Sequence, residues 1–375
     1  MLYLYYIIIN NSQKQGDFIM NNSQKLDFND TNLYIGIDVH KKNWEVAIRC
    51  NGIQLKRFNM EASVDHLAAF LNRTYPKANY IAVYEAGFCG FWICRQLDGL
   101  GINCTVVNPA DVPTSQKEKL NKNDRIDAGK LSRELEKNSL QEIYVPDPFH
   151  EQLRSLMRFR KQLAKERTRT KNRIKALLFY YGYSIPAEFA DRNWSGHFIN
   201  WLKQLPFQYE AGKQTLDRLI KMLEYIRQAI KETLKALREM AKDPLINPTI
   251  KALISVPGVA FITAMTFYTE IMDISRFSNF NKLASFVGLV PTRKGSGETE
   301  YDRGITFRKN KILRPILIES AWVAAAADPA LTMKFNQLCK TMTRQKAIIR
   351  IAKKLLSRMR YVWMNQKEYV KAVIK

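Results

Sequence analysis

Apolar and polar residues alternate in several short segments of the first third of the chain, and this pattern predicts β-strands. Five such segments read YIGIDV, EVAIRC, IQLKRFNM, IAVYEAG and NCTVVNP. Asn51-Gly52 separates the second segment from the third and is a strong signal for a two-residue hairpin turn. Helical spacing of apolar residues occurs at residues 64–73, 91–101 and 124–135. Three antiparallel strands followed by β-α-β alternation match the order of an RNase H-like fold.

The segment from about His150 to Lys242 lacks strand signals and carries two long helical patterns. The first, RSLMRFRKQLAKERTRTKNRIKALLFYYGY, has Leu, Met and Phe at helical intervals, and the second, TLDRLIKMLEYIRQAIKETLKALREMAK, has heptad-like spacing. Together they predict a coiled-coil arm, formed either within one chain or between two chains. Because the first pattern is rich in Arg and Lys, one of its faces either meets phosphate or is a solvated charged surface.

The remainder of the chain predicts a third, mainly helical unit. ALISVPGVAFITAMTFYTEI is an apolar helix, a Pro-Gly turn and a second apolar helix, and such a helix-hairpin-helix-like element exposes N–H groups that can seat a phosphate. KGSGETEYDRG follows as an expected Gly/Ser-rich loop, and two further basic helical segments close the chain. The expected fold class is therefore α/β plus all-α. Its expected parts are a flexible extension at 1–30, an α/β domain at 31–147, a helical coiled-coil linker at 148–243 and a C-terminal domain at 244–375.

The N-terminal extension begins with MLYLYYIIIN, an apolar run too short to span a bilayer and without the features of a signal peptide. A polar stretch follows in which NNSQK occurs at Asn11 and again at Asn21. Translation could start at Met1 or at Met20, and the sequence leaves both open.

The composition indicates a globular protein with a polyanionic partner. Of 375 residues, 46% are hydrophobic and 25% charged, and 59 Lys and Arg against 35 Asp and Glu give a net charge of +24. Nucleic acid is favoured over a membrane surface as this partner, because Lys and Arg release condensed counterions from phosphate backbones. The odd count of five cysteines without metal-ligand spacing predicts reduced, buried thiols in a cytoplasmic protein. For a protein with a nucleic-acid partner, the expected location is cytoplasmic and nucleoid-associated.

Four acidic residues are candidates for a metal site. Asp38 stands among apolar residues of the first strand, Glu85 closes the fourth, and Asp124 and Asp127 are three apart on one predicted helix face. Carboxylates are costly to bury unless they are paired or hold a cation, and oxygen-only ligation suits Mg²⁺ or Mn²⁺. The alternatives are surface acids or, for Asp124, a helix cap.

The motifs GIDVHKK, YEAGFCG, NDRIDAGKL, SVPGVAFITA and FVGLVPTRKGSGE, in this order, resemble the DEDD transposases of bacterial insertion sequences. That family includes Piv-type DNA invertases and recombinases guided by a bridge RNA, and the resemblance covers roughly residues 33–363. It implies a RuvC-like N-terminal domain, a coiled-coil linker and a C-terminal transposase domain that supplies a nucleophilic serine. The sequence departs from the family pattern at PGVA in the Pro-Gly turn, which bears on how a phosphate is seated, and at FRKNKILR, which bears on the loop beyond the serine.

The resemblance assigns Asp38, Glu85, Asp124 and Asp127 to the acidic tetrad, with all four as catalytic metal ligands. It assigns Ser296 as the nucleophile, between glycines that let a phosphate approach. Rival serines are Ser255, Ser285 and Ser320, which the helical context disfavours. His40 is either a general base or a polar strand-end residue. The residues expected to contact nucleic-acid phosphate are Lys41, Lys42, Arg293, Lys294, Arg303, Arg308, Lys309 and Lys311.

The expected function is thus that of a transposase or site-specific recombinase of a mobile insertion sequence. The expected cofactor is Mg²⁺ or Mn²⁺, and the expected partners are double-stranded DNA at the element ends and target, a noncoding guide RNA, and further copies in a homodimer or homotetramer. No membrane partner is expected. Alternatives are a metal-only RuvC-type nuclease or junction resolvase, a DNA invertase of the same build, and a binding protein without catalytic activity.

Overall fold

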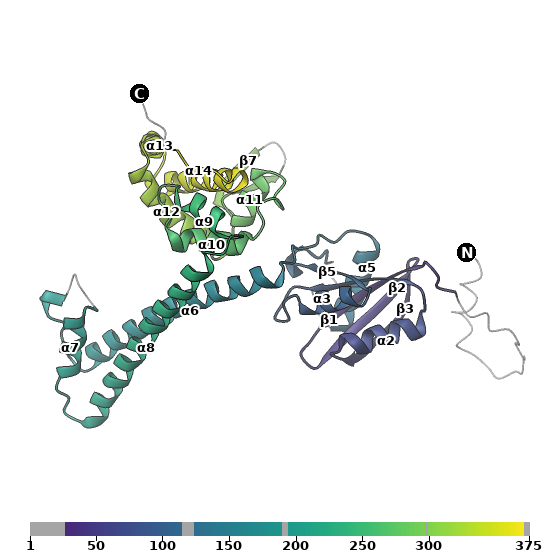
Figure 1. Ribbon diagram of the computed structural model, residues 1–375, viewed down its shortest axis with the longest axis horizontal. Coiled ribbons are helices and arrows are strands. Elements are labelled where there is room, and N and C mark those ends of the chain that lie inside the picture. Colours follow the sequence, from purple (N-terminus) through teal and green to yellow (C-terminus); the bar gives the residue numbers. More distant parts are fainter. Residues whose placement is uncertain (1–26, 115–123, 190–193, 297–298, 371–375) are drawn as a thin grey trace, which may run out of the picture. The chain divides into compact units, whose positions relative to one another are not determined.

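The chain divides into two compact units, Met1–Val145 and Pro146–Lys375 (Figure 1). The first unit is a mixed α/β structure and the second is mostly helical. This computed structural model describes residues 27–114, 124–189, 194–296 and 299–370, and among these it leaves out the side chains of 124–126 and 293–303. The expected extension at residues 1–30 therefore lies almost entirely outside the described residues.

The first unit is built on a five-stranded sheet with the strand order β3-β2-β1-β4-β5. β1 and β2, and β2 and β3, are antiparallel, whereas β1 and β4, and β4 and β5, are parallel. This topology confirms the predicted three-strand meander followed by β-α-β alternation. The elements are β1 (Asn32–Val39), β2 (Asn43–Cys50), β3 (Ile53–Glu61), α2 (Val64–Thr74), β4 (Asn79–Glu85), α3 (Trp92–Gly99), β5 (Asn103–Val107), the 3-10 turn η1 (Pro109–Asp111) and α5 (Asp124–Glu136).

One face of the sheet is covered by α2 and α3. Leu33, Ile35 and Ile37 alternate along β1, are fully buried, and pack with the apolar faces of both helices. Burying each such side chain contributes about 1.5–3 kcal/mol. The expected hairpin turn is present, since Asn51 (φ 47°) and Gly52 (φ 78°) both have the left-handed backbone that this turn requires.

The other face is covered by α5, which packs closely on β1 at Gly36. A Cβ atom at this glycine would lie 2.2 Å from the carbonyl oxygen of Ala128 and 2.5 Å from the amide nitrogen of Ser132. The far end of the helix is tied to the β2–β3 turn, because Glu136 accepts hydrogen bonds from Gly52 N (2.6 Å) and Arg49 Nε (3.0 Å). These contacts place the N-terminal end of α5 near the carboxyl end of β1.

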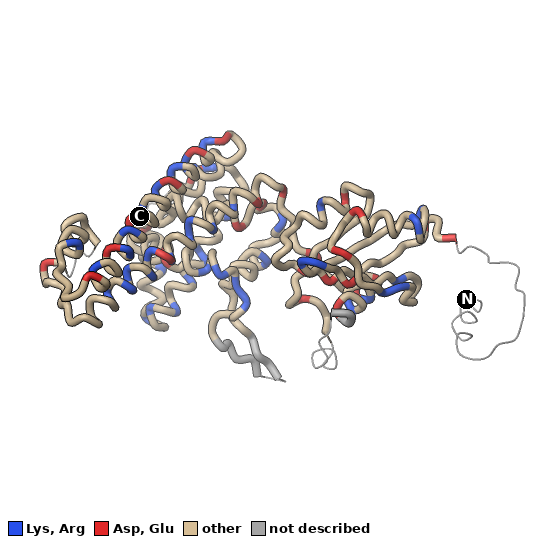
Figure 2. The backbone as a smooth tube through the Cα atoms, turned by 90° about the horizontal axis from the view of Figure 1, so that it is seen from below, with Lys and Arg blue, Asp and Glu red and all other residues tan. Residues whose placement is uncertain are grey.

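The second unit begins with a pair of long helices (Figure 1). The start of α6 shares a core with the end of α8, and the end of α6 shares another with the start of α8, so the two run antiparallel within one chain. The helical arm therefore pairs internally. Lys and Arg recur along both helices, interrupted by Asp and Glu (Figure 2). The elements are α6 (Pro148–Tyr180), the 3-10 turn η2 (Ala187–Phe189), α7 (Gly196–Gln204), which the apolar pattern did not predict, and α8 (Glu210–Met240).

The C-terminal helices form one large apolar core with the adjoining ends of α6 and α8. The Pro-Gly turn between α9 and α10 is present, and Gly258 (φ 85°) approaches the backbone of α12, where a Cβ would lie 2.5 Å from the carbonyl oxygen of Ser320. Packing against α12 thus explains this glycine. The elements are α9 (Asn247–Ile254), α10 (Phe261–Ile271), α11 (Phe280–Val287), α12 (Leu313–Ala327), α13 (Pro329–Cys339) and α14 (Arg344–Asn365).

The segment expected to be a Gly/Ser-rich loop is a β-hairpin instead. β6 (Pro291–Ser296) pairs antiparallel with β7 (Thr299–Ile305), in a register that sets Ser296 opposite Thr299. Thr, Tyr and Ile in the second strand favour extended backbone, and they outweigh the glycines that suggested a loop.

Two further observations concern the whole described chain. All five cysteines are free thiols, and Cys50, Cys94 and Cys104 are buried as predicted, whereas Cys89 and Cys339 are partly exposed. Within the described residues, no single helix is long and apolar enough to cross a membrane, although α12 and α13, bent by 105°, meet the length and composition criteria together.

Candidate active site

Two of the predicted acids lie side by side at the carboxyl edge of the sheet. β1 and β4 are parallel neighbours, and Ile37 pairs with Tyr84 as the last recorded pair in their register. Asp38 and Glu85 follow these residues directly, and both strands end within one residue of them. Because side chains alternate along a strand, Asp38 lies on the face of Gly36 and Glu85 on the face of Val83. That is the face on which α5 packs.

The third predicted acid comes from α5 and reaches the sheet through a lysine. Lys130 Nζ lies 3.1 Å from Asp127 Oδ1 and 4.0 Å from Glu85 Oε1. The Lys130 side chain is only 7% exposed, whereas Asp127 and Glu85 are 22% and 31% exposed. A buried ammonium group therefore stabilises two acids from different elements at the edge of the sheet.

Asp38 has two polar neighbours on the β1–β2 side. His40 Nε2 lies 3.2 Å from Asp38 Oδ2, and the Asp38 side chain is 24% exposed. Glu45 stands directly opposite Asp38 in the antiparallel register, so the two side chains share a face. Glu45 is 8% exposed and accepts a hydrogen bond of 2.8 Å from Asn59 Nδ2. A polar row thus crosses three strands beside the carboxyl edge.

Lys130 and Glu45 are the two site residues that the sequence analysis did not identify. Lys130 lies three residues after Asp127, so helical spacing alone would have put it on the same face. Glu45 interrupts the apolar run of the second strand, and pairing across the tight β1–β2 connection would have set it opposite Asp38. Both signals were present in the sequence, although each was weak without the sheet register.

The acidic side chains at this edge offer only oxygen atoms as ligands, and oxygen ligands suit a hard divalent cation. Within the residues whose side chains are described, no group of three or more His, Cys, Asp or Glu is close enough to hold a metal ion. Asp124 begins α5, three residues before Asp127, and its side chain lies outside that description. Asp38, Glu85 and Asp127 are thus gathered in one region, with the Lys130 ammonium supplying positive charge between two of them.

The predicted nucleophile belongs to the second unit. Ser296 ends β6, and its side chain is outside the described part, as are those of Arg293, Lys294 and Arg303. Two rival serines are engaged in the core. Ser320 is 5% exposed and lies 3.2 Å from the Thr263 hydroxyl, while Ser255 donates to the Ala252 carbonyl at 2.7 Å. The remaining residues predicted to contact nucleic acid are all exposed: Lys41, Lys42, Arg308, Lys309 and Lys311.

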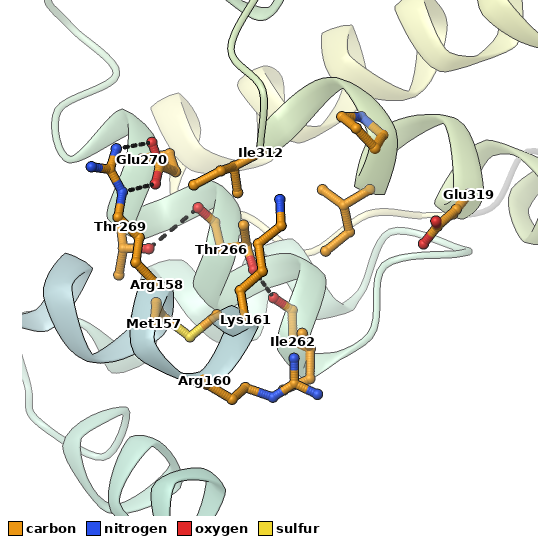
Figure 3. A pocket seen from close by; sticks show the side chains of 12 residues that line it. Met157, Arg158, Arg160, Lys161, Ile262, Thr266, Thr269, Glu270, Ile312 and Glu319 are labelled. Atoms are coloured by element: carbon orange, nitrogen blue, oxygen red, sulfur yellow. Dashed lines mark hydrogen bonds and ion pairs between the residues drawn. The ribbon is translucent and has the colours of Figure 1, made fainter. Parts of the chain in front are cut away.

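A cavity of about 150 Å³ in the second unit is lined in part by charged residues (Figure 3). The role of its most buried charge is structural. Glu270, at its wall, is 3% exposed and accepts two hydrogen bonds from Arg158, at 2.8 and 2.9 Å, and one from Asn310 at 3.1 Å. Burial alone would raise the pKa of the Glu270 carboxyl. The hydrogen bonds and charge of Arg158 outweigh burial and lower that pKa. Both oxygens are satisfied, so this acid is fixed in a structural ion pair.

Comparison with known proteins adds a family to this geometry. Residues 35–182 match a family model described as "Transposase", and residues 250–336 match one described as "Transposase IS116/IS110/IS902 family". The protein "Putative transposase y4rJ" of Sinorhizobium fredii is 30% identical over 362 residues, which cover 86% of this chain and 90% of the relative. "Putative transposase y4qE" of the same species is 28% identical over 293 residues, covering 77% and 71%. "Transposase for insertion sequence element IS1111A" of Coxiella burnetii is 29% identical over 245 residues, covering 65% of each.

Proposed function

Because the chain belongs to the IS116/IS110/IS902 family of transposases, we propose that it cuts and rejoins DNA with the acids at the carboxyl edge of its sheet and with Ser296. Transposases act on DNA by breaking and joining strands, and transposases of the DEDD type generally use a divalent metal ion. The proposal assigns these two steps to particular residues of this chain.

The observation that carries the proposal is the convergence of three acids from separate elements. Asp38 and Glu85 end neighbouring parallel strands, and Asp127 reaches the same edge from α5. All three lie within the part of the chain that matches the transposase model. The sheet order, with a meander followed by parallel strands, supports a RuvC-like fold for residues 31–147. The linker at 148–243 and the transposase domain at 244–375 complete the proposed division.

Asp38, Glu85, Asp124 and Asp127 would hold Mg²⁺ or Mn²⁺, which supplies Lewis-acid stabilisation of the charge on phosphate oxygens when bound. Lys130 holds Asp127 and Glu85 together and limits their mutual repulsion. Asn59 holds Glu45, and Glu45 adds negative charge beside Asp38. The exposed Lys41 and Lys42 follow Asp38 and bind DNA phosphate next to the acids.

Ser296 carries the covalent step. Its oxygen attacks the phosphorus of the scissile phosphodiester, an O–P bond forms, and the bond from phosphorus to the 3′ oxygen breaks. The serine proton is lost to the surrounding base or water, and the 3′ oxygen leaves as a 3′ hydroxyl after taking up a proton. A 3′ hydroxyl of the second strand then attacks the phosphoserine and restores the serine hydroxyl. The energy of one phosphodiester bond is thereby kept, so that no nucleotide triphosphate is needed.

The resemblance to bridge-RNA-guided recombinases supports two further parts of the proposal. A noncoding RNA selects the element ends and target in double-stranded DNA, and two or four copies of the chain assemble on them. Basic residues throughout the chain, with a net charge of +24, provide the charge that both nucleic acids require.

The test is covalent trapping on end-labelled, paired-site DNA with Mg²⁺ and with RNA co-purified from the expression host. We expect wild type to give a slowly migrating DNA band that protease removes, and Ser296→Ala and Asp38→Asn to give none. Ser285→Ala is the matched control and retains the band. Cleavage by Ser296→Ala that leaves free 5′ ends and needs Asp38 would contradict the serine step and leave a metal-only RuvC-type nuclease.

A second arm separates a transposase from an invertase of the same build. Two sites are placed on one DNA molecule in inverted orientation, or on two separate molecules. Joining between separate molecules supports transposition, whereas products that arise only by inversion on one molecule contradict it.

A further inference from the structure

The segment between β7 and α12, residues 306–311, carries an apolar ring that the proposed chemistry does not use. Phe307 is 93% exposed, the highest value for a large hydrophobic side chain among the described residues. Its neighbours Arg308, Lys309 and Lys311 are also exposed. The ring is directly followed by these cations, and exposed aromatic and basic side chains close together are typical of surfaces that bind nucleic acid.

The segment is held firmly at its first end. Thr306 N donates to the Val290 carbonyl at 3.0 Å, which continues the pairing of the β6–β7 hairpin. The guanidinium of Arg314, itself 8% exposed, donates to the Gly288 carbonyl at 3.0 Å and to the Thr306 carbonyl. Gly288 has a φ of 84°, and a Cβ there would lie 2.5 Å from Lys309 Cβ, so the segment packs directly on the end of α11.

Its second end is fixed by a buried network. Asn310 N donates to the Phe286 carbonyl at 3.1 Å, and Asn310 Oδ1 accepts from the backbone of Ile312 (2.8 Å) and Leu313 (2.9 Å) to cap α12. Asn310 Nδ2 donates to Glu270 at 3.1 Å. Arg158 neutralises this acid (Figure 3). Phe307 and Arg308 are thus displayed from a segment that is anchored on both sides.

We infer that Phe307 is a stacking platform for an unpaired DNA base, with Arg308, Lys309 and Lys311 contacting the flanking phosphates. Aromatic rings interleaved with cations bind single-stranded nucleic acid in this way, because every base offers a π-face and every linkage a charge. An intact duplex presents its phosphates but covers the faces of its bases. The ring therefore selects a nucleotide that has left the stack.

This inference rests on the proposed function in one respect. Strand cutting and rejoining leaves bases unpaired between the break and the new joint, and the segment directly follows the hairpin whose first strand ends at Ser296. A second copy of the chain is the competing occupant of Phe307. It is disfavoured by charge, since three exposed cations follow Phe307 within the next four residues, and a second copy would bring the same cations against them.

The test measures binding without chemistry, in a Ser296→Ala background, so that failure of the serine step does not affect the outcome. The probes are two DNAs of one sequence, one fully paired and one with a short unpaired gap that contains 2-aminopurine. Phe307→Ala is expected to weaken binding of the gapped DNA about tenfold and of the duplex less than about twofold. Phe307→Trp is expected to keep the affinity and to quench 2-aminopurine, whereas Phe307→Leu behaves like Phe307→Ala.

Control variants separate the effect of the Phe307 ring on DNA binding from the effects of positive charge and of self-association. Lys309→Ala should weaken binding of both DNAs and reduce the salt dependence of binding. An unchanged affinity of Phe307→Ala for gapped DNA would overturn the inference, and so would an equal loss on both probes. A change in molar mass by light scattering would assign the ring to a contact between copies, and a larger loss on single-stranded RNA than on gapped DNA would overturn the choice of DNA.

Discussion

Acidic side chains lie in two contrasting settings, one in each unit of the molecule. In the second unit, Glu270 is 3% exposed, and Arg158 and Asn310 bond both of its oxygens. At the carboxyl edge of the sheet, Asp38, Glu85 and Asp127 stay 22–31% exposed, and a single buried lysine lies between two of them. The first arrangement is electrostatically complete. The second is partly open to solvent, and we propose that it holds a further cation.

The difference shows that burial of charge does not by itself identify an active site. A carboxylate whose oxygens are all occupied by fixed protein donors stabilises one conformation, and it cannot also hold an ion or a substrate. Acids that remain partly exposed and are crowded together bear a repulsion that a bound cation relieves. Removing the acid of the second unit should therefore lower the free energy of unfolding, whereas removing an acid at the sheet edge should abolish DNA cutting.

The largest effect is expected from removing the buried acid of the second unit. Glu270→Ala removes a buried carboxylate together with its hydrogen bonds from Arg158 and Asn310, and this should lower the free energy of unfolding by about 2–4 kcal/mol, measured by urea denaturation. Asp38→Asn is the matched variant at the sheet edge and should leave unfolding nearly unchanged while it abolishes cutting. Equal destabilisation by the two variants would break the comparison.

A smaller effect is expected at Lys130. Lys130→Met keeps the length of the side chain but removes the charge between Asp127 and Glu85, so in EDTA the free energy of unfolding should fall by about 1–3 kcal/mol. Mg²⁺ should raise the melting temperature more in this variant than in wild type, because the ion replaces the lost charge. Lys137→Met, one residue beyond the end of α5, is the control, since Lys137 is 61% exposed and lies 3.9 Å from Glu134. No difference between the two variants would refute the role given to Lys130.

The smallest effect concerns pH. The pKa of Glu270 is lowered, because Arg158 outweighs the opposing effect of burial, so its ion pair stabilises the folded state above the ordinary pKa of glutamate. That contribution is lost as pH falls through the lowered pKa of the folded state. In Glu270→Gln the group does not titrate, so the gap in melting temperature between wild type and variant should narrow as the solution is acidified from neutral. A gap that stays constant to pH 3 would contradict this linkage.

Much of the first unit could be predicted from the sequence, because its strands are buried on alternate faces and their turns have specific signals. The apolar pattern of Leu33, Ile35 and Ile37 and the Asn51-Gly52 turn predicted the meander, and this brought Asp38 and Glu85 to one edge. Glu45 and Lys130 were missed because their roles depend on register and on how α5 lies across β1. A side chain at position 36 would clash with the backbone of α5, so α5 can pack this closely on β1 only because residue 36 is glycine.

The second unit was harder to predict, for physical reasons that its residues make clear. Glycines at 295 and 297 suggested a loop, whereas pairing with β7 satisfies the backbone of residues 291–296 in a hairpin. The link from Arg158 through Glu270 to Asn310 joins residues that are far apart in the chain, and no local pattern marks it. The exposure of Phe307 likewise has no local sequence signal, so it too required the structure.

A direct measurement of Mn²⁺ binding would show whether the acids at the sheet edge form the metal site. Free and bound Mn²⁺ would be distinguished by electron paramagnetic resonance in wild type, Asp38→Asn and Glu270→Gln, each at a temperature where the variant is folded. We expect saturable binding of Mn²⁺ to wild type, at least about tenfold weaker binding to Asp38→Asn, and unchanged binding to Glu270→Gln. Binding that is unaffected by Asp38→Asn, or that is lost in Glu270→Gln, would contradict this expectation.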